Sequence, residues 1–336
     1  MKKRERGPRG RGASPSAQPP EPYSEASIPL FCCGVCMLII LAAFVIDRLV
    51  HPFSNGLLAP AILEIVAVLL PAYLVILAVY PGRSPIDQIR AVGPWKLRAK
   101  YIFFIIFASA FLICASVPIA IIFGATGKQA EGFVLLGTFV AGKSEYTVAL
   151  PYLILVYAVI PAIAEEILLR GLVLSQLRGV GFAAGAAVSA LLSALLNFSV
   201  AGFIPAVFAA IVLCFVMYTT RSLVACIITH FVFNLYRLML ESNVSAYYES
   251  SSSRVLLIVV VIGLTLIFGA LFFGEAARLY GERAEKVSSG EQEGTKLSLG
   301  TTLSDLKRIV AYRPTAIMAC ICAAIFVAVV TVEYFV

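Results

Sequence analysis

Long apolar runs dominate the chain, and short polar segments separate them. The runs are continuous in Leu, Ile, Val, Ala and Phe instead of alternating with a period of two, which favours helices over the strands of a barrel. A helix needs about 20 residues to cross a hydrocarbon core of about 30 Å. Nine runs approach or exceed this length, near residues 29–47, 57–80, 101–123, 148–169, 182–198, 203–219, 222–240, 254–274 and 314–335. The pattern predicts an all-α polytopic membrane protein with about nine transmembrane helices.

Composition agrees with this fold class. Of the 336 residues, 60% are hydrophobic and only 13% are charged, and the mean hydropathy is +0.95. These values lie well outside the range of ordinary soluble domains. We therefore expect a multi-pass integral membrane protein. The small single-domain build favours a bacterial plasma membrane.

The distribution of Lys and Arg predicts the orientation, because positively charged loops stay on the cytoplasmic side. Five segments on one side hold 21 of the 26 basic residues: 1–27, 81–100, 170–178, Arg221 and 275–313. The other side holds Arg48, Lys128, Lys143, Arg237 and Arg254. We predict a cytoplasmic N-terminus and an outside C-terminus, as an odd number of helices requires.

Residues 1–27 are basic and rich in Pro, Gly and Ser, which predicts a disordered cytoplasmic tail. Membrane lipid is its expected partner, because anionic headgroups attract a juxtamembrane cationic segment. Nucleic acid is not expected, since the tail has neither interleaved aromatic residues nor a folded basic face. The remaining predicted units are three helices in 28–124, a core in 125–245, an eighth helix in 246–274, a cytoplasmic linker in 275–313 and a last helix in 314–336.

Ionisable residues inside the fourth run are the most informative exceptions to this pattern. Glu165, Glu166 and Arg170 lie in an otherwise apolar stretch. A charge at bilayer depth costs roughly 2.5–3.5 kcal/mol on insertion scales, so an intramembrane ionisable residue indicates a functional site. Adjacent carboxylates repel, and Arg170, four residues after Glu166, is the obvious partner for that glutamate. Glu165 is then available as a general base.

Three further polar residues fall in the same layer of the membrane. His230 and Asn234 are four residues apart on one face of the seventh helix, and Asn197 lies in the fifth. At 1.5 Å per residue, Glu165, Asn197, His230 and Asn234 lie roughly 20, 22, 12 and 18 Å from the cytoplasmic helix ends. We expect a polar intramembrane site among helices 4, 5 and 7. The simpler alternative is a set of interhelical hydrogen bonds, worth roughly 0.6–2 kcal/mol each.

Two other features of the runs bear on this site. Pro161 lies one turn before the glutamate pair and predicts a kink in the fourth helix, because proline cannot donate a backbone hydrogen bond. Glu64 is a lone carboxylate in the second run. We predict that it snorkels or pairs and lies outside the site.

These residues resemble the motifs of the CPBP family of intramembrane proteases, the Abi group that includes CAAX prenyl proteases and lysostaphin-resistance-type proteins. Glu165-Glu166-Ile-Leu-Leu-Arg170 resembles the family's EExxxR motif, and His230-Phe-Val-Phe-Asn234 resembles its HxxxN motif. The segment beginning at Tyr218 is similar to the turn that precedes that helix. The resemblance covers about 150–240, so the predicted core of 125–245 is CPBP-like.

One motif departs from the family pattern. The family has FxxxH on the intervening helix, and the best placement here is Ser193-Ala-Leu-Leu-Asn197, with Ser for the aromatic residue and Asn for the histidine. The only other histidine, His51, lies in a predicted outer loop, too far away to replace it. An amide is a poor zinc ligand, and HExxH is absent. The sequence therefore does not support a classical zinc site, although the family is sometimes described as metalloproteases. We expect an activity that is metal-independent or weakly metal-dependent, with no other cofactor assigned.

The resemblance implies an endopeptidase in which Glu165 activates water, while His230 and Asn234 position it or stabilise the oxyanion. The substrate would be a membrane-associated peptide or membrane protein, cut near its cytoplasmic end; it is open whether the target is prenylated or a peptide precursor. Asn197 supports an alternative, an inactive relative that binds or scaffolds a membrane partner. A transporter with a carboxylate proton relay is disfavoured, because no inverted repeat is evident.

Overall fold

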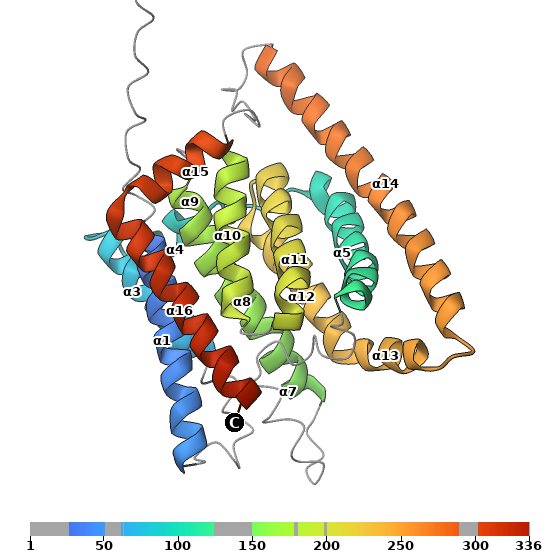
Figure 1. Cartoon of the computed structure of the whole chain (residues 1–336). Helices are drawn as coiled ribbons and strands as arrows, with labels where there is room; N and C mark the ends of the chain where they lie inside the picture. The colour runs from blue at the N-terminus through green and yellow to red at the C-terminus, as the bar shows by residue number, and fades with distance from the viewer. Residues whose placement is uncertain are drawn as a thin grey trace, which may run out of the picture.

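The computed structural model describes residues 27–50, 62, 64–123, 150–177, 181–197, 200–288 and 302–335. All regular secondary structure in these ranges is helical (Figure 1). Apart from Ser27, the predicted N-terminal tail lies outside the described residues. His51 lies outside them too. The fold class predicted from the apolar runs is therefore confirmed for the described part of the chain.

The N-terminal region contains two long helices and several short ones. They are α1 (Ser27–Val50), the π-helix η2 (Ile65–Leu69), α3 (Leu70–Val79), α4 (Pro85–Val92), the 3-10 turn η3 (Ala99–Tyr101) and α5 (Ile102–Ile122). Helix α4 is short, but its start is well defined. Pro85 occupies the first turn, and the Ser84 hydroxyl accepts a hydrogen bond from the Asp87 amide at 3.2 Å. Such N-caps satisfy amides that have no partner within the helix.

The central region supplies the fourth to seventh apolar runs. One continuous helical run comprises α7 (Leu150–Ile154), η5 (Leu155–Val159), α8 (Ile160–Glu166), η6 (Ile167–Val173) and α9 (Leu174–Gln176). It is followed by α10 (Phe182–Leu196), α11 (Val200–Thr220), α12 (Leu223–Met239) and α13 (Glu241–Glu249). The chain then continues through α14 (Arg254–Ser288), α15 (Thr302–Ala311) and α16 (Arg313–Phe335). Two parts of the predicted linker are thus helical, one in α14 and one in α15.

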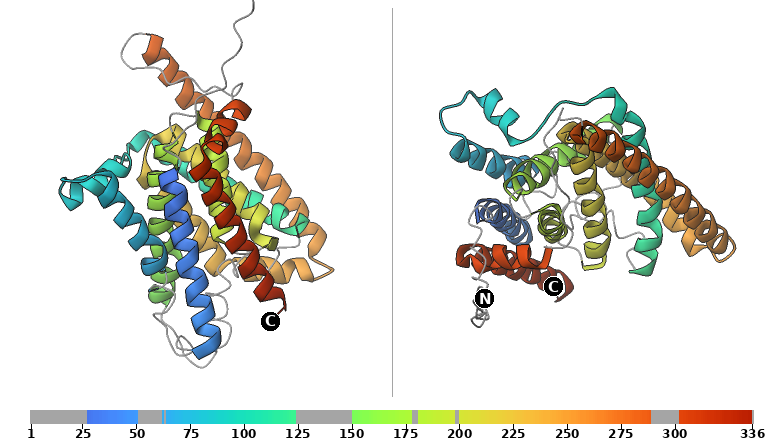
Figure 2. Two further views of the ribbon diagram at one scale, coloured as in Figure 1. Left: turned by 60° about the vertical axis from the view of Figure 1, so that its left-hand side comes forward. Right: turned by 90° about the horizontal axis from the view of Figure 1, so that it is seen from above.

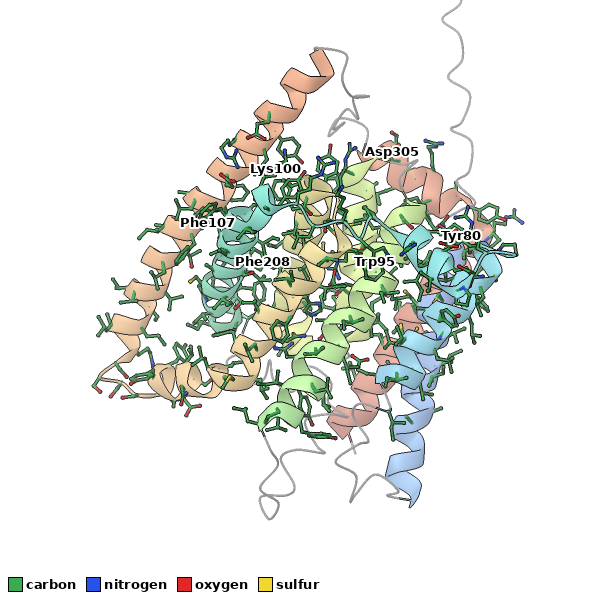
Figure 3. All side chains as sticks on the ribbon, turned by 180° about the vertical axis from the view of Figure 1, so that it is seen from behind. Tyr80, Trp95, Lys100, Phe107, Phe208 and Asp305 are labelled. Carbon is green, nitrogen blue, oxygen red and sulfur yellow. The ribbon has the colours of Figure 1, made fainter. Side chains whose placement is uncertain are left out.

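Two apolar clusters hold the helices together. Seen from above, α1 and α16 lie on one side of the bundle and α5 and α14 on the other, with α10 and α11 between them (Figure 2). The first cluster joins α1, α3, η6, α10 and α16. The second joins α5, α11, α12 and α14, and at its centre the Phe104 and Phe272 rings stack 5.1 Å apart. Phe107 and Phe208 lie in this half of the bundle (Figure 3).

Apolar side chains also cover much of the outer surface. In α14, for example, only 11% of the most hydrophobic stretch is buried against the rest of the protein. An apolar surface of this extent indicates contact with lipid. Charged residues such as Lys100, whose Nζ lies 3.1 Å from Glu282 Oε2, and Asp305 gather at one end of the bundle (Figure 3). The described part of the chain is therefore an integral membrane protein.

The number of spans is less well defined than the class. Four described helices are long and apolar enough to cross a membrane: Ala99–Ile122, Leu150–Gln176, Val200–Thr220 and Arg254–Glu282. The number rises to six if two bent pairs each form one span, Leu223–Met239 with Asn243–Glu249 and Ser304–Ala311 with Arg313–Ala328. Three apolar helices are shorter, Leu30–Ala43, Ile65–Val79 and Phe182–Leu196. Nine spans therefore stays a prediction.

Candidate active site

Two π-helical segments flank the glutamate pair. The first, η5, ends where the Ile160 amide donates to the Leu155 carbonyl, and Pro161 follows directly. The second, η6, begins immediately after Glu166 and contains Arg170. π-Segments are rare and occur often at functional sites. The helix therefore has a widened segment on each side of Glu165 and Glu166. The kink predicted at Pro161 stays a prediction.

Glu166 is the centre of a buried ionic cluster. Its Oε1 atom lies 2.9 Å from Arg170 Nη1 and 2.8 Å from His230 Nδ1. The side chains of Glu166 and Arg170 are both fully buried, and that of His230 is 10% exposed. Arg170 Nη2 also donates to the Ala210 carbonyl at 3.1 Å. The cluster links the α8–η6 run to α11 and α12, and it contains the Glu166–Arg170 pair predicted from their spacing.

The hydrogen bond to Glu166 determines how His230 is presented. An ionised carboxylate only accepts hydrogen bonds, so Nδ1 of His230 carries the proton in this contact. In a neutral imidazole the other nitrogen, Nε2, is then an acceptor. His230 is therefore held at one nitrogen, and its second nitrogen can bind a water molecule or substrate.

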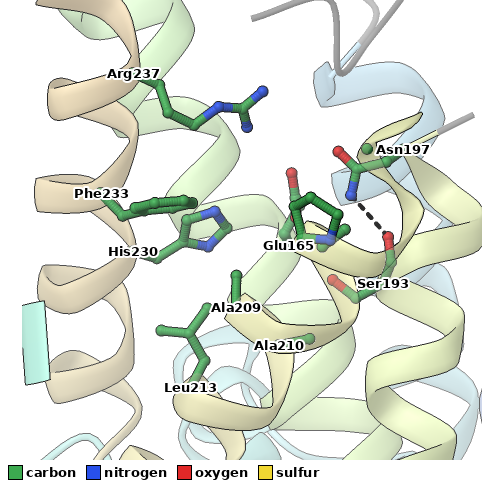
Figure 4. A pocket seen from close by; sticks show the side chains of 12 residues that line it. Glu165, Ser193, Asn197, Ala209, Ala210, Leu213, His230, Phe233 and Arg237 are labelled. Carbon is green, nitrogen blue, oxygen red and sulfur yellow. Dashed lines mark hydrogen bonds between the residues drawn. The ribbon is translucent and has the colours of Figure 1, made fainter. Parts of the chain in front are cut away.

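Glu165 and His230 line the same pocket. Its volume is about 60 Å³, and the other lining residues include Ser193, Asn197 and Arg237. Figure 4 shows Glu165, Ser193 and Asn197 on one side and His230, Phe233 and Arg237 on the other. A cavity needs roughly 10–15 Å³ to hold a water molecule, so this pocket has room for more than one. The pocket brings together residues from the three helices on which the sequence analysis placed its site.

Asn197 lines the pocket at the end of α10. Its Nδ2 donates to the Ser193 carbonyl at 2.9 Å, and its backbone amide donates to the Ala194 carbonyl at 3.3 Å. The amide NH₂ group is thus used by its own helix. The carbonyl oxygen is turned toward the side of the pocket on which Arg237 lies (Figure 4). At this position the side chain presents an acceptor to the pocket.

Asn234 occupies a different position from the other predicted residues. It is buried on α12, one turn beyond His230, and it is not among the described residues that line the pocket. Arg237 does line it, although the sequence analysis counted this residue only as an outer basic residue. Its spacing of seven from His230 was the available signal, because residues i and i+7 share a helix face. Arg237 Nε lies 3.7 Å from Glu241 Oε2.

Glu64 was also missed as a neighbour of the site. It is only 1% exposed, and neither of its carboxylate oxygens has a hydrogen-bond partner among the described residues. It precedes η2, which packs against α8, the helix that carries Glu165. The sequence analysis predicted a snorkelling or paired side chain, and a buried carboxylate without a described partner does not agree with this. The prediction failed because nothing in the local sequence indicates which helix packs against Glu64.

The residues of the pocket do not fit a conventional metal centre. Zinc is held by imidazole, thiolate or carboxylate groups, with three protein ligands in catalytic sites. The pocket offers one imidazole and one carboxylate, and Asn197 supplies an amide. Within the described ranges, no group of three or more His, Cys, Asp or Glu residues comes together to hold a metal ion. The donor set of the pocket therefore does not match a catalytic zinc site.

Comparison with known proteins identifies the family of this region. Residues 147–236 match the sequence model of a family described as type II CAAX prenyl endopeptidase Rce1-like. The match covers roughly a quarter of the chain and includes the glutamate pair, Asn197, His230 and Asn234. No curated protein and no solved structure matches the chain. Residues 147–236 are thus similar to the type II CAAX prenyl endopeptidases, which supports the resemblance to the CPBP proteases.

Proposed function

We propose that the chain is an intramembrane endopeptidase of the CPBP type, acting on a peptide bond of a membrane-associated substrate. One observation carries the proposal: Glu165 and His230 face one water-sized pocket, and the buried Glu166–Arg170 pair holds the His230 ring. A structural role alone does not require a second, partly buried carboxylate beside that cluster. The protease family of residues 147–236 supports the same reaction class.

In the proposed reaction, a water molecule lies between Glu165 and His230. Glu165 takes one proton from the water, and the second hydrogen is held by His230 Nε2. The water oxygen attacks the scissile carbonyl carbon and forms a tetrahedral intermediate. The proton on Glu165 then passes to the amide nitrogen, and the C–N bond breaks. The remaining hydroxyl proton passes through His230 Nε2 to the released amine, so a carboxylate and a protonated amine leave. Hydrolysis therefore balances without a metal or other co-reactant.

Arg237 is the proposed donor to the oxyanion of this intermediate. It lines the same pocket as Glu165, and a guanidinium group offers several N–H donors. Asn197 is less suitable, because one of its two amide hydrogens already donates to the Ser193 carbonyl and fixes the side chain against its own helix. Asn234 does not line the pocket among the described residues, so we propose a supporting role for it on α12. Removing one oxyanion donor typically costs about 10²–10³-fold in turnover.

The position of the pocket bears on where the substrate is cut. Its lining comes from the last turn of α10, the first turns of α11 and the second half of α12. If the Lys and Arg distribution gives the orientation, this end faces away from the cytoplasm. We infer a cut in the outer half of the membrane, in place of one near the cytoplasmic end. A volume of about 60 Å³ is far below the roughly 300–1,000 Å³ of ligand pockets, so substrate binding must widen the site.

We also retain the nine-span topology as a proposal. Each of the nine apolar runs overlaps a helix or a bent helix pair in the described ranges, which supports this count. A cytoplasmic N-terminus and an outside C-terminus follow from the predicted loops, and the small single-domain build favours a bacterial plasma membrane. Reporter fusions at 81–100 and 289–301 test the orientation, because both segments are expected on the cytoplasmic side.

The second candidate function is an inactive relative that binds or scaffolds a membrane partner. It is favoured by Asn197, which replaces the imidazole of the family's second motif and directs its NH₂ group to its own helix. In this alternative, the same pocket is present but the protein does not hydrolyse a peptide bond. The identity of the bound partner would again be a membrane-associated peptide or protein.

Hydrolysis by the purified chain distinguishes these functions. The protein in lipid nanodiscs is incubated with membrane-associated peptides, prenylated and unprenylated, and the products are identified by mass spectrometry. We expect cleavage that is lost in Glu165→Gln and retained in Glu249→Gln, a matched change at an exposed residue of α13. Cleavage that persists in Glu165→Gln contradicts the proposed base. Binding without cleavage by the intact chain supports the inactive alternative.

A further inference from the structure

A second, larger cavity lies at the opposite end of the bundle. Its volume is about 650 Å³, roughly ten times that of the Glu165 pocket and within the usual range for ligand sites. It is bounded by α4, the η6–α9 segment, the start of α10 and the end of α11. The proposed hydrolysis makes no use of it.

Three arginines line this cavity, and none of the described lining residues is acidic. Arg90 comes from α4, Arg170 from η6 and Arg221 from the turn between α11 and α12. Arg221 holds a φ of 49°, which is uncommon for a residue with a side chain. Arg170 is fully buried, and its Nε atom has no hydrogen-bond partner among the described residues. The positive charge of the lining indicates an anionic ligand.

Carboxylates near the cavity offset this charge only in part. Asp87 lies 3.8 Å from Arg90, but both side chains are well exposed, and such pairs bind weakly. Glu166 pairs with Arg170 from the opposite side. Asp305 approaches the edge of the cavity at Gly181 and lies 3.8 Å from Arg308. None of these three carboxylates lines the cavity.

The start of α10 adds backbone donors. Gly181 is the N-cap residue, with a φ of 87°, and as a glycine it has no side chain to cap this end. The first amides of a helix have no partner within the helix and, with the helix dipole, favour a bound anion. Gly181 and Phe182 both line the cavity. Backbone donors and arginines therefore face the same space.

The remaining walls are apolar, which narrows the class of ligand. Phe182, Leu174, Leu177 and Met217 line the cavity beside the arginines. This combination suits an amphiphile with an anionic head. The cavity also lies at the end of the bundle where the Lys and Arg distribution predicts the cytoplasmic leaflet, whose anionic lipids attract basic groups.

We propose that this cavity binds the phosphate group of an anionic membrane lipid, between Arg90, Arg221 and the first amides of α10, with Arg170 at its inner wall. Arg170 also contacts Glu166, which holds His230. The lipid site is thus adjacent to the ionic cluster of the proposed active site. Binding itself does not depend on whether the chain is a protease.

Lipid binding by the full chain tests this proposal. The protein is purified in a neutral detergent, and its affinity for short-chain phosphatidylglycerol is measured by tryptophan fluorescence or native mass spectrometry. Short-chain phosphatidylcholine and inorganic phosphate are the comparison ligands. We expect phosphatidylglycerol to bind at least tenfold more tightly than either. Equal binding of inorganic phosphate identifies a free anion as the ligand and overturns the lipid assignment.

Substitutions locate the binding. Arg90→Gln with Arg221→Gln should weaken phosphatidylglycerol binding at least tenfold, whereas Arg98→Gln, at an exposed arginine outside the lining, should change it less than twofold. Arg90→Gln alone alters a 72% exposed side chain, so it tests the site even if the double variant does not fold. Unchanged binding in a folded Arg90→Gln protein, or equal loss in Arg98→Gln, contradicts the proposed site.

Discussion

In the buried Glu166–Arg170–His230 cluster, we expect removal of the glutamate charge to destabilise the fold more than removal of the arginine charge. Glu166→Gln keeps the size and an acceptor oxygen but leaves the fully buried Arg170 charge without a counterion. Arg cannot lose its proton in proteins, so this charge has no means of relief. Breaking a buried ion pair by removing one partner typically costs about 3–5 kcal/mol. We expect Glu166→Gln to fall in that range.

The reciprocal change should cost less. Arg170→Met leaves Glu166 with His230 Nδ1 at 2.8 Å, and either group can change its protonation state to remove an isolated charge. The bond from Arg170 to the Ala210 carbonyl is lost as well, at about 1 kcal/mol. The double variant removes both charges, and replacing a whole buried pair is often neutral. It should therefore be more stable than Glu166→Gln alone.

Reversible unfolding in mixed micelles, followed by circular dichroism, measures the free energy of unfolding of the three variants. Glu249→Gln, an exposed substitution, is the control and should match the intact chain. A cost below about 1 kcal/mol for Glu166→Gln would show that the buried charge is hydrated or otherwise compensated. A double variant no more stable than Glu166→Gln would refute the proposed asymmetry.

Three further changes test the neighbourhood of the site. Gly171→Ala should destabilise the fold by about 1–3 kcal/mol, because the new Cβ would lie 2.4 Å from Val92 Cγ1. Adding Val92→Ala should restore most of the lost stability, measured by thermal unfolding. A double variant no more stable than Gly171→Ala would contradict the steric reason. Arg237→Leu should lower turnover about 10²–10³-fold while leaving the substrate KM within a few fold, and an unchanged kcat would exclude the oxyanion role. Asn197→His should raise turnover by restoring an imidazole in the pocket, measured on the same peptides, and an unchanged rate would show that this position is not limiting.

The sequence was sufficient for the membrane fold and for much of the candidate site. Apolar runs identify helices because every backbone polar group in lipid must be satisfied within its own segment. The spacing of Glu166 and Arg170 predicted their pairing, which the structure contains at 2.9 Å. The helical layer predicted for Glu165, Asn197 and His230 corresponds to one pocket. Their catalytic roles remain a proposal.

Other features depend on contacts between helices that no local pattern encodes. The π-segments on either side of the glutamates have the same apolar composition as ordinary helix. Glu64 gave no sign of its proximity to Glu165, because its neighbour lies about a hundred residues away in the chain. Arg237 resembled a basic residue at a helix end, and only packing turns it toward the pocket. The arginine cavity likewise combines four separate segments.

Mapping new protein termini in cells tests the central claim most directly. Membrane-associated peptides and proteins are compared between cells that express the intact chain and cells that express Glu165→Gln at equal abundance in the membrane. The account predicts a set of N- and C-termini that disappears with the substitution and identifies the substrate. Identical termini in both populations, with the variant inserted normally, would contradict proteolysis and favour the binding or scaffolding role.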